Sequence, residues 1–77
     1  MEIQIIAFGK ISDIITDQNL ELSGINDTDE LKVYLENRFS ALSGVKYKLA
    51  LNKKIVQSKQ ELTDQDTLVL MSPFSGG

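Results

Sequence analysis

The residues most able to do chemistry are the last two of the sequence, Gly76 and Gly77. They carry no side chain, so the backbone can enter a space too narrow for other residues. Pro73 lacks a backbone N–H and marks where a tail would leave the strand before it. Extended, residues 73–77 would span roughly 17 Å at about 3.4 Å per residue. The pattern predicts a tail that presents the Gly77 carboxylate at the bottom of a partner's cleft.

The residues between the proline and the glycines are suited to contact that partner. Phe74 is an aromatic anchor and Ser75 is small and polar, so we expect Pro73, Phe74 and Ser75 to lie against the cleft wall. The alternative is an ordinary frayed end, because chain termini are poorly ordered unless something holds them.

Composition limits what the chain can do without a partner. A domain of 77 residues buries only about 60% of its unfolded-chain surface, which leaves no room for a deep active site of its own. The absence of cysteine excludes a disulfide framework, a thiolate nucleophile and a zinc–thiolate site, and the absence of histidine removes the usual near-neutral base. We therefore expect no catalysis by the chain alone, no metal site and no bound cofactor.

Net charge and hydropathy limit the kinds of partner that the chain can bind. The net charge of −3 and pI near 4.7 argue against a nucleic-acid binder and fit contact with a basic partner surface. No leader opens the sequence, and no run approaches the roughly 20 apolar residues of a membrane span. The expected location is the cytoplasm, with no membrane partner.

Apolar periodicity predicts five strands and one helix. The strands are expected at residues 2–8, 20–22, 47–52, 55–56 and 67–71. The helix is expected within residues 26–42, where five apolar side chains form one stripe: Leu31, Tyr34, Leu35, Phe39 and Leu42. Asp27 and Glu30 form a capping box at its start, and Gly44 is the expected C-terminal cap.

This order of elements predicts an α+β fold in which one helix covers one face of a mixed sheet of four to five strands, a β-grasp. The domain is expected to occupy residues 1–72 and a flexible tail residues 73–77. The crossover from the second strand through the helix is expected to bring the third strand parallel to the first.

Strand parity predicts which side chains face away from the helix. If Ile3 and Ile5 face the helix, Ile6 and Phe8 face away from it. On the last strand Leu68 and Leu70 would face in, which leaves Val69 and Met71 on the outer face. Phe8, Ile55 and Met71 are then expected to join into an exposed apolar patch beside the tail, and such patches mark interaction sites. The alternative is that these side chains pack beneath loops.

Four segments together resemble the family of molybdopterin synthase small subunits. They are residues 5–10 (IIAFGK), 49–52 (LALN), 62–66 (LTDQD) and 72–77 (SPFSGG), and the similarity extends over nearly the whole chain. The strand and tail at the end are the specific part. The resemblance implies a ubiquitin-like β-grasp and a sulfur carrier that works through its C-terminal glycine.

The family's chemistry implies a role for each matching residue. An E1-like adenylating enzyme would use ATP to activate the Gly77 carboxylate, and a sulfur donor protein would displace AMP to leave a thiocarboxylate. The loaded tail would enter the molybdopterin synthase large subunit, with Gly76 as its slender neck, and donate sulfur to cyclic pyranopterin monophosphate. Phe8, Ile55 and Met71 match positions at which the family meets the large subunit.

The sequence departs from the family at several positions and leaves other functions open. Only one proline precedes Phe74, Met71 replaces a common aromatic residue, Gln65 stands where a turn glycine is usual, and Ser12 replaces a frequent arginine. The alternatives are a sulfur carrier for thiazole (thiamine) synthesis or tRNA thiolation, a ubiquitin-like protein modifier, and a purely structural adaptor. A ferredoxin-type β-grasp is excluded by the missing cysteines.

Overall fold

The computed structural model describes residues 1–73. The expectations for Phe74, Ser75, Gly76 and Gly77, including a flexible tail, fall outside the described residues.

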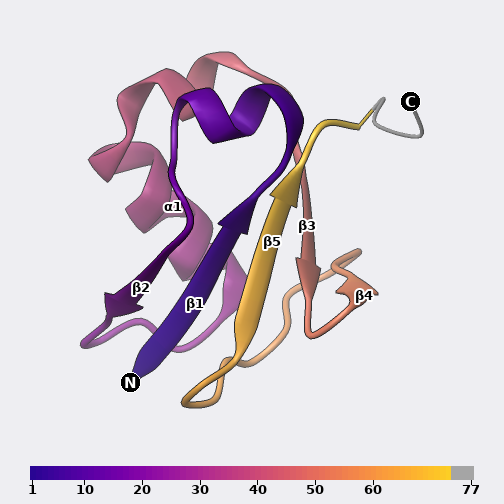
Figure 1. Ribbon diagram of the computed structural model, residues 1–77. Helices are drawn as coiled ribbons and strands as arrows, with labels where there is room; N and C mark the ends of the chain where they lie inside the picture. The colour runs from indigo at the N-terminus through magenta and orange to yellow at the C-terminus, as the bar shows by residue number, and fades with distance from the viewer. Residues whose placement is uncertain (74–77) are drawn as a thin grey trace.

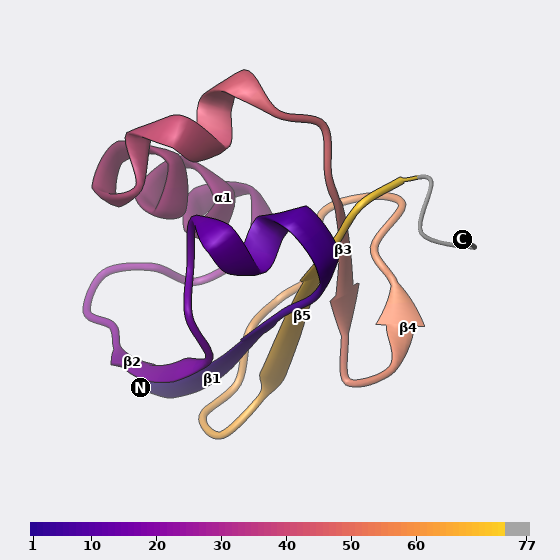
Figure 2. The same cartoon turned by 45° about the horizontal axis from the view of Figure 1, so that its top comes forward.

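The described chain forms a mixed five-stranded sheet with one main helix (Figure 1). The regular elements are β1 (Glu2–Ala7), β2 (Gln18–Glu21), α1 (Thr28–Arg38), β3 (Lys48–Leu51), β4 (Lys54–Ile55) and β5 (Thr67–Met71). Two short 3-10 helices, η1 (Gly9–Asp13) and η2 (Ser40–Gly44), follow β1 and α1. The sheet order is β2-β1-β5-β3-β4, and α1 lies on one face, as the two views of Figures 1 and 2 show. The predicted β-grasp architecture is confirmed.

One expectation about strand direction is wrong. The parallel neighbour of β1 is β5, whereas β3 pairs with β5 in antiparallel fashion and so runs opposite to β1. The crossover rule relates the two strands that the helix connects, β2 and β3, and these do run in the same direction. Because β2 is antiparallel to β1, β3 cannot be parallel to β1.

The N-terminus of α1 is capped as predicted, but its C-terminus is not. The Glu30 N–H donates to Asp27 Oδ1 at 2.8 Å, while Glu30 Oε1 accepts from the N–H of Asn26, one residue before the cap, at 2.7 Å. The helix ends at Arg38, and the chain continues through η2, so Gly44 closes that 3-10 turn and does not cap α1. The apolar stripe still reaches the core, because η2 turns Leu42 inward to full burial.

The core fills the space between α1 and the inner face of the sheet. Strand parity is confirmed by complete burial of Ile3 and Ile5 on β1 and of Leu68 and Leu70 on β5. These side chains cluster with the α1 leucines Leu31 and Leu35, and with Ile11 and Ile15 from the segment around η1. Each such side chain contributes about 1.5–3 kcal/mol when it leaves water.

A polar network fixes the β3–β4 hairpin to the start of β5. Asn52 and Lys53 form the turn of the hairpin with φ values of 49° and 75°, the left-handed backbone that two-residue hairpin turns need. Asn52 Nδ2 donates to Asp66 Oδ1 at 2.8 Å, and Asn52 Oδ1 accepts from the N–H of Thr67 at 2.9 Å. Thr63 donates to both Asp66 oxygens, through its N–H and its hydroxyl. The buried Asp66 carboxylate is thus fully hydrogen-bonded and orders the residues that lead into β5.

No helix among residues 1–73 is long and apolar enough to cross a bilayer.

Candidate docking surface

The outer face of the sheet, opposite α1, carries an apolar row that crosses four strands. Ile6 on β1 pairs with Val69 on β5, Val69 pairs with Ala50 on β3, and Ala50 pairs with Ile55 on β4. Directly paired residues point to the same side of a sheet, so the four side chains share one face. They form a continuous strip on the side that α1 leaves open.

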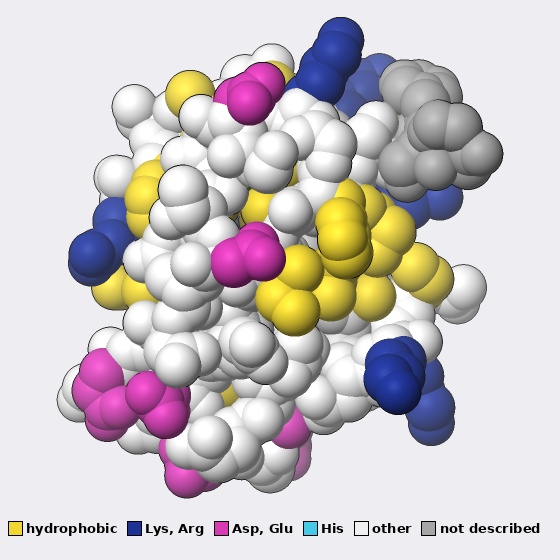
Figure 3. All heavy atoms as spheres, in the orientation of Figure 1, with side chains coloured by type: hydrophobic (Ala, Val, Ile, Leu, Met, Phe, Trp, Pro, Cys, Tyr) yellow, Lys and Arg dark blue, Asp and Glu magenta, His cyan; other side chains and the backbone are white. Residues whose placement is uncertain are grey.

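A second row lies two residues further along the strands. Met71 on β5 pairs with Lys48 on β3, and Phe8 follows β1 in the register that places it beside Met71. The Phe8 side chain is 55% exposed and that of Ile55 is 51% exposed, whereas Met71 is half-buried. The two rows form the surface that Figure 3 shows as one hydrophobic area over the sheet. We call it the outer patch, and its members are Ile6, Phe8, Ala50, Ile55, Val69 and Met71.

The predicted patch residues are therefore brought together, and the patch is larger than expected. Phe8, Ile55 and Met71 lie on one face and are not covered by loops of the described chain. Ile6 and Val69 were expected on the outer face but not as site residues, and both are half-buried. Ala50 was not among the expected site residues and is buried. Alternation with buried neighbours was the available signal for Ile6 and Val69, but only the strand order shows that these two residues and Ala50 complete one row with Ile55.

The outer patch adjoins the point where the chain leaves the sheet. β1 and β5 run parallel and end at the same edge, and the Phe8 N–H donates to the Leu70 carbonyl at 3.0 Å. β5 ends at Met71, and Pro73 follows it in a turn, half-buried. A surface that binds the outer patch would also lie beside the start of the predicted tail.

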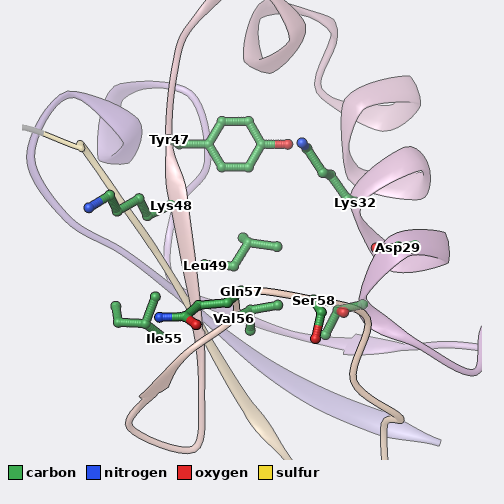
Figure 4. A pocket seen from close by; sticks show the side chains of 10 residues that line it. Asp29, Lys32, Tyr47, Lys48, Leu49, Ile55, Val56, Gln57 and Ser58 are labelled. Carbon is green, nitrogen blue, oxygen red and sulfur yellow. The ribbon is translucent and has the colours of Figure 1, made fainter.

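A hollow of about 410 Å³ lies between α1 and the β3–β4 region (Figure 4), and its lining reaches Lys48 and Ile55 at the edge of the outer patch. Leu49 and Val56 form its floor and Lys32 and Tyr47 its rim. The Tyr47 hydroxyl donates to Glu36, and the Lys32 ammonium lies 5.5 Å from the Tyr47 ring centroid. Burial first, and then the Glu36 hydrogen bond and charge, raise the pKa of Tyr47. A phenol held in its protonated form does not act as a base.

The described residues offer no cluster of three or more carboxylates that could hold a metal ion. What distinguishes the site chemically is its apolar face and its position beside the chain exit.

Comparison with known proteins identifies the family. The ThiS family model matches residues 5–77, nearly the whole chain. The chain belongs to the ThiS family. It is a ubiquitin-like protein of the sulfur-carrier type, as the resemblance implied. No curated protein matches the chain.

Solved structures agree with this fold. A putative molybdopterin converting factor subunit 1 from Pyrococcus furiosus is 15% identical with a TM-score of 0.82, over 94% of this chain and 97% of that chain. SAMP1 from Haloferax volcanii is 17% identical with a TM-score of 0.79, over all of both chains. A chain of the complex of subunits 1 and 2 of molybdopterin-converting factor from Helicobacter pylori 26695 is 26% identical with a TM-score of 0.70, again over all of both chains.

Proposed function

We propose that this ThiS-family chain is the sulfur-carrier subunit of a molybdopterin synthase. The main support for the proposal is the outer patch, which lies beside the end of β5. The ThiS family match also extends through Gly77. The similarity to a structure described as a complex of the two subunits of molybdopterin-converting factor supports a large subunit as the partner. In this account the cytoplasm is the site of action.

The proposed reaction takes place on the Gly77 carboxylate. An E1-like adenylating enzyme transfers AMP from ATP to the carboxylate and releases pyrophosphate. Sulfide from a sulfur donor protein then attacks the acyl carbon, AMP leaves, and a thiocarboxylate remains. In the large subunit the thiocarboxylate sulfur forms a C–S bond to cyclic pyranopterin monophosphate as a C–O bond at the same carbon breaks and the oxygen group leaves. Water then hydrolyses the resulting thioester, which leaves the sulfur on the pterin and returns the Gly77 carboxylate. A second loaded chain supplies the second sulfur of the dithiolene. Gly76 keeps the chain narrow enough to reach that site.

The described residues contribute docking rather than acid–base chemistry. Phe8, Ile55 and Met71 anchor the large subunit. Pro73 and, beyond the described residues, Phe74 and Ser75 are expected to lead the chain toward its cleft. Exposed aromatic and aliphatic side chains clustered on a rigid sheet suit such anchors, because little ordering is needed when they bind.

The test is reconstituted sulfur transfer. The thiocarboxylate form of the protein is incubated with the large subunit and cyclic pyranopterin monophosphate, and the dithiolene product is measured. Product formation supports the proposal. A loaded protein that transfers no sulfur to this precursor, but does so to the thiazole precursor with its own synthase, would assign the chain to thiamine synthesis instead.

A protein modifier is the second candidate, because the fold also matches SAMP1, described as a small archaeal modifier protein in a Methanosarcina acetivorans structure at 19% identity. In that case Gly77 would form isopeptide bonds with lysines of other proteins. Mass spectrometry of tryptic digests distinguishes the two, since only the modifier leaves a remnant of its C-terminus on substrate lysines.

A further inference from the structure

The charges of this chain are strongly segregated along the sequence. Residues 37–60 contain six of the eight Lys and Arg residues and none of the eleven Asp and Glu residues. In the fold this segment runs from the end of α1 through β3 and β4 to the following loop. The chain is therefore acidic overall but strongly basic along the β3–β4 side of the sheet.

One of these lysines, Lys48, belongs to the same face as the outer patch, and Lys46 lies just before the same strand. Lys48 pairs with Met71 and so lies on the outer face. Lys46 lies two residues before β3 and is exposed, and the intervening Tyr47 packs against the core and donates to Glu36 on the inner side. Figure 3 shows basic side chains next to the hydrophobic area on its β3–β4 side, and carboxylates toward β1 and β2.

The chain does not neutralise these lysines itself. In the described part of the chain, the single ion pair joins the Met1 ammonium to Glu21 on β2, at the edge of the sheet opposite β4. Lys46, Lys48, Lys53 and Lys54 are exposed. Their charges are available to a partner without breaking any internal ion pair.

We propose that the partner protein that docks on the outer patch presents an acidic surface opposite Lys46 and Lys48. This inference rests on the proposed function and adds the chemistry and orientation of the interface. It reverses the expectation from net charge, which favoured a basic partner surface. Segregation of charge across one face also fixes orientation, because a partner turned by half a revolution would place its carboxylates against the acidic side at β1 and β2.

The apolar rows favour a protein over a nucleic acid as the occupant. An apolar centre with charged groups at its rim is the usual composition of a protein interface. Single-stranded nucleic acid needs aromatic side chains on which bases stack, and the outer patch offers only Phe8.

The experiment compares single charge reversals of equal net effect. Lys48→Glu and Lys46→Glu change the rim of the outer patch. Lys59→Glu is the matched control, since Lys59 is exposed in the loop that pairs with the start of α1 on the other side of the sheet. Association rates and Kd are measured for the large subunit and for the E1-like enzyme, at about 0.1 M and about 1 M salt, where the Debye lengths are about 10 Å and about 3 Å. Circular dichroism confirms that each variant is folded.

Lys48→Glu is expected to slow association with at least one of the two enzymes about tenfold at the lower salt, with a smaller effect for Lys46→Glu and less than twofold for Lys59→Glu. The differences in association rate between the variants and the wild-type protein are expected to be smaller at the higher salt. Equal effects of Lys48→Glu and Lys59→Glu, with normal binding of the wild-type protein, would overturn this inference and leave the proposed function standing. A wild-type protein that binds neither enzyme would overturn both. Binding of a labelled single-stranded RNA that Lys48→Glu abolishes, with protein binding unchanged, would assign the basic side to nucleic acid and also overturn the inference.

Discussion

The Phe8 N–H donates a hydrogen bond of 3.0 Å to the Leu70 carbonyl, which extends the β1–β5 ladder one residue beyond Ala7. This bond holds an exposed aromatic side chain beside the end of the strand from which the chain leaves the sheet. Phe8 is thereby fixed for contact with another molecule while it adds little to the core.

Phe8→Ala is expected to weaken binding far more than folding. Because the side chain is 55% exposed, its loss should lower the free energy of unfolding by only about 1 kcal/mol. As an interface anchor it should raise the Kd for the large subunit about 30-fold, or about 2 kcal/mol. Val33→Ala is the matched control, since Val33 is 60% exposed on α1 and away from the sheet's outer face. Equal binding by both variants would remove Phe8 from the interface.

Gln65 is expected to tolerate glycine and to reject a β-branched residue. Its φ of 72° lies in the left-handed region, which costs an L-residue about 1–2 kcal/mol. Gln65→Gly removes that cost but adds about 0.5–1 kcal/mol of unfolded-state entropy and loses an exposed side-chain hydrogen bond to Glu2. We expect urea unfolding to show a change within about 1 kcal/mol for Gln65→Gly and a clear loss for Gln65→Val. Similar stabilities for the glycine and valine variants would contradict a left-handed Gln65.

Asp66 is expected to make stability depend on pH in the acid range. Burial disfavours the charged carboxylate, but hydrogen bonds from Asn52 and Thr63 outweigh it and lower the pKa of Asp66 below 3.8. A folded-state pKa below the unfolded one stabilises the protein fully above about pH 4, and this contribution is lost as the pH falls through the folded pKa. Asp66→Asn should therefore be less stable by about 1–3 kcal/mol at pH 7.

The measurement is urea unfolding of the wild-type protein and Asp66→Asn between pH 7 and the acid limit of folding. The difference in free energy of unfolding between the wild-type protein and Asp66→Asn should become smaller below about pH 4. The difference is the informative quantity, because a hydrogen bond from the Glu2 N–H also lowers the pKa of the exposed Asp64 in both proteins. A pH-independent difference would show that Asp66 acts only through its shape and neutral hydrogen bonds.

The outward position of Phe8 and Met71 could be predicted because a strand alternates its faces over a few residues, a strictly local rule. The Asp27 cap and the Asn52 turn are local in the same sense. The early end of α1 could not be predicted, since Leu42 keeps helical spacing with Leu35 although the chain between them changes to a 3-10 turn. The alignment of Lys48 with Met71 depends on which strands are neighbours, and residues more than twenty positions apart carry no sequence signal of that pairing.

Intact-mass spectrometry shows whether Gly77 carries sulfur as a thiocarboxylate. The protein is measured before and after incubation with ATP, the E1-like adenylating enzyme and a sulfur donor, beside a variant that lacks Gly77. The account predicts a mass increase equal to the replacement of one oxygen by sulfur in the wild-type protein and none in the deletion variant. An unchanged mass under every loading condition, with an adenylating enzyme shown to be active on another carrier, would contradict the sulfur-carrier account of Gly77.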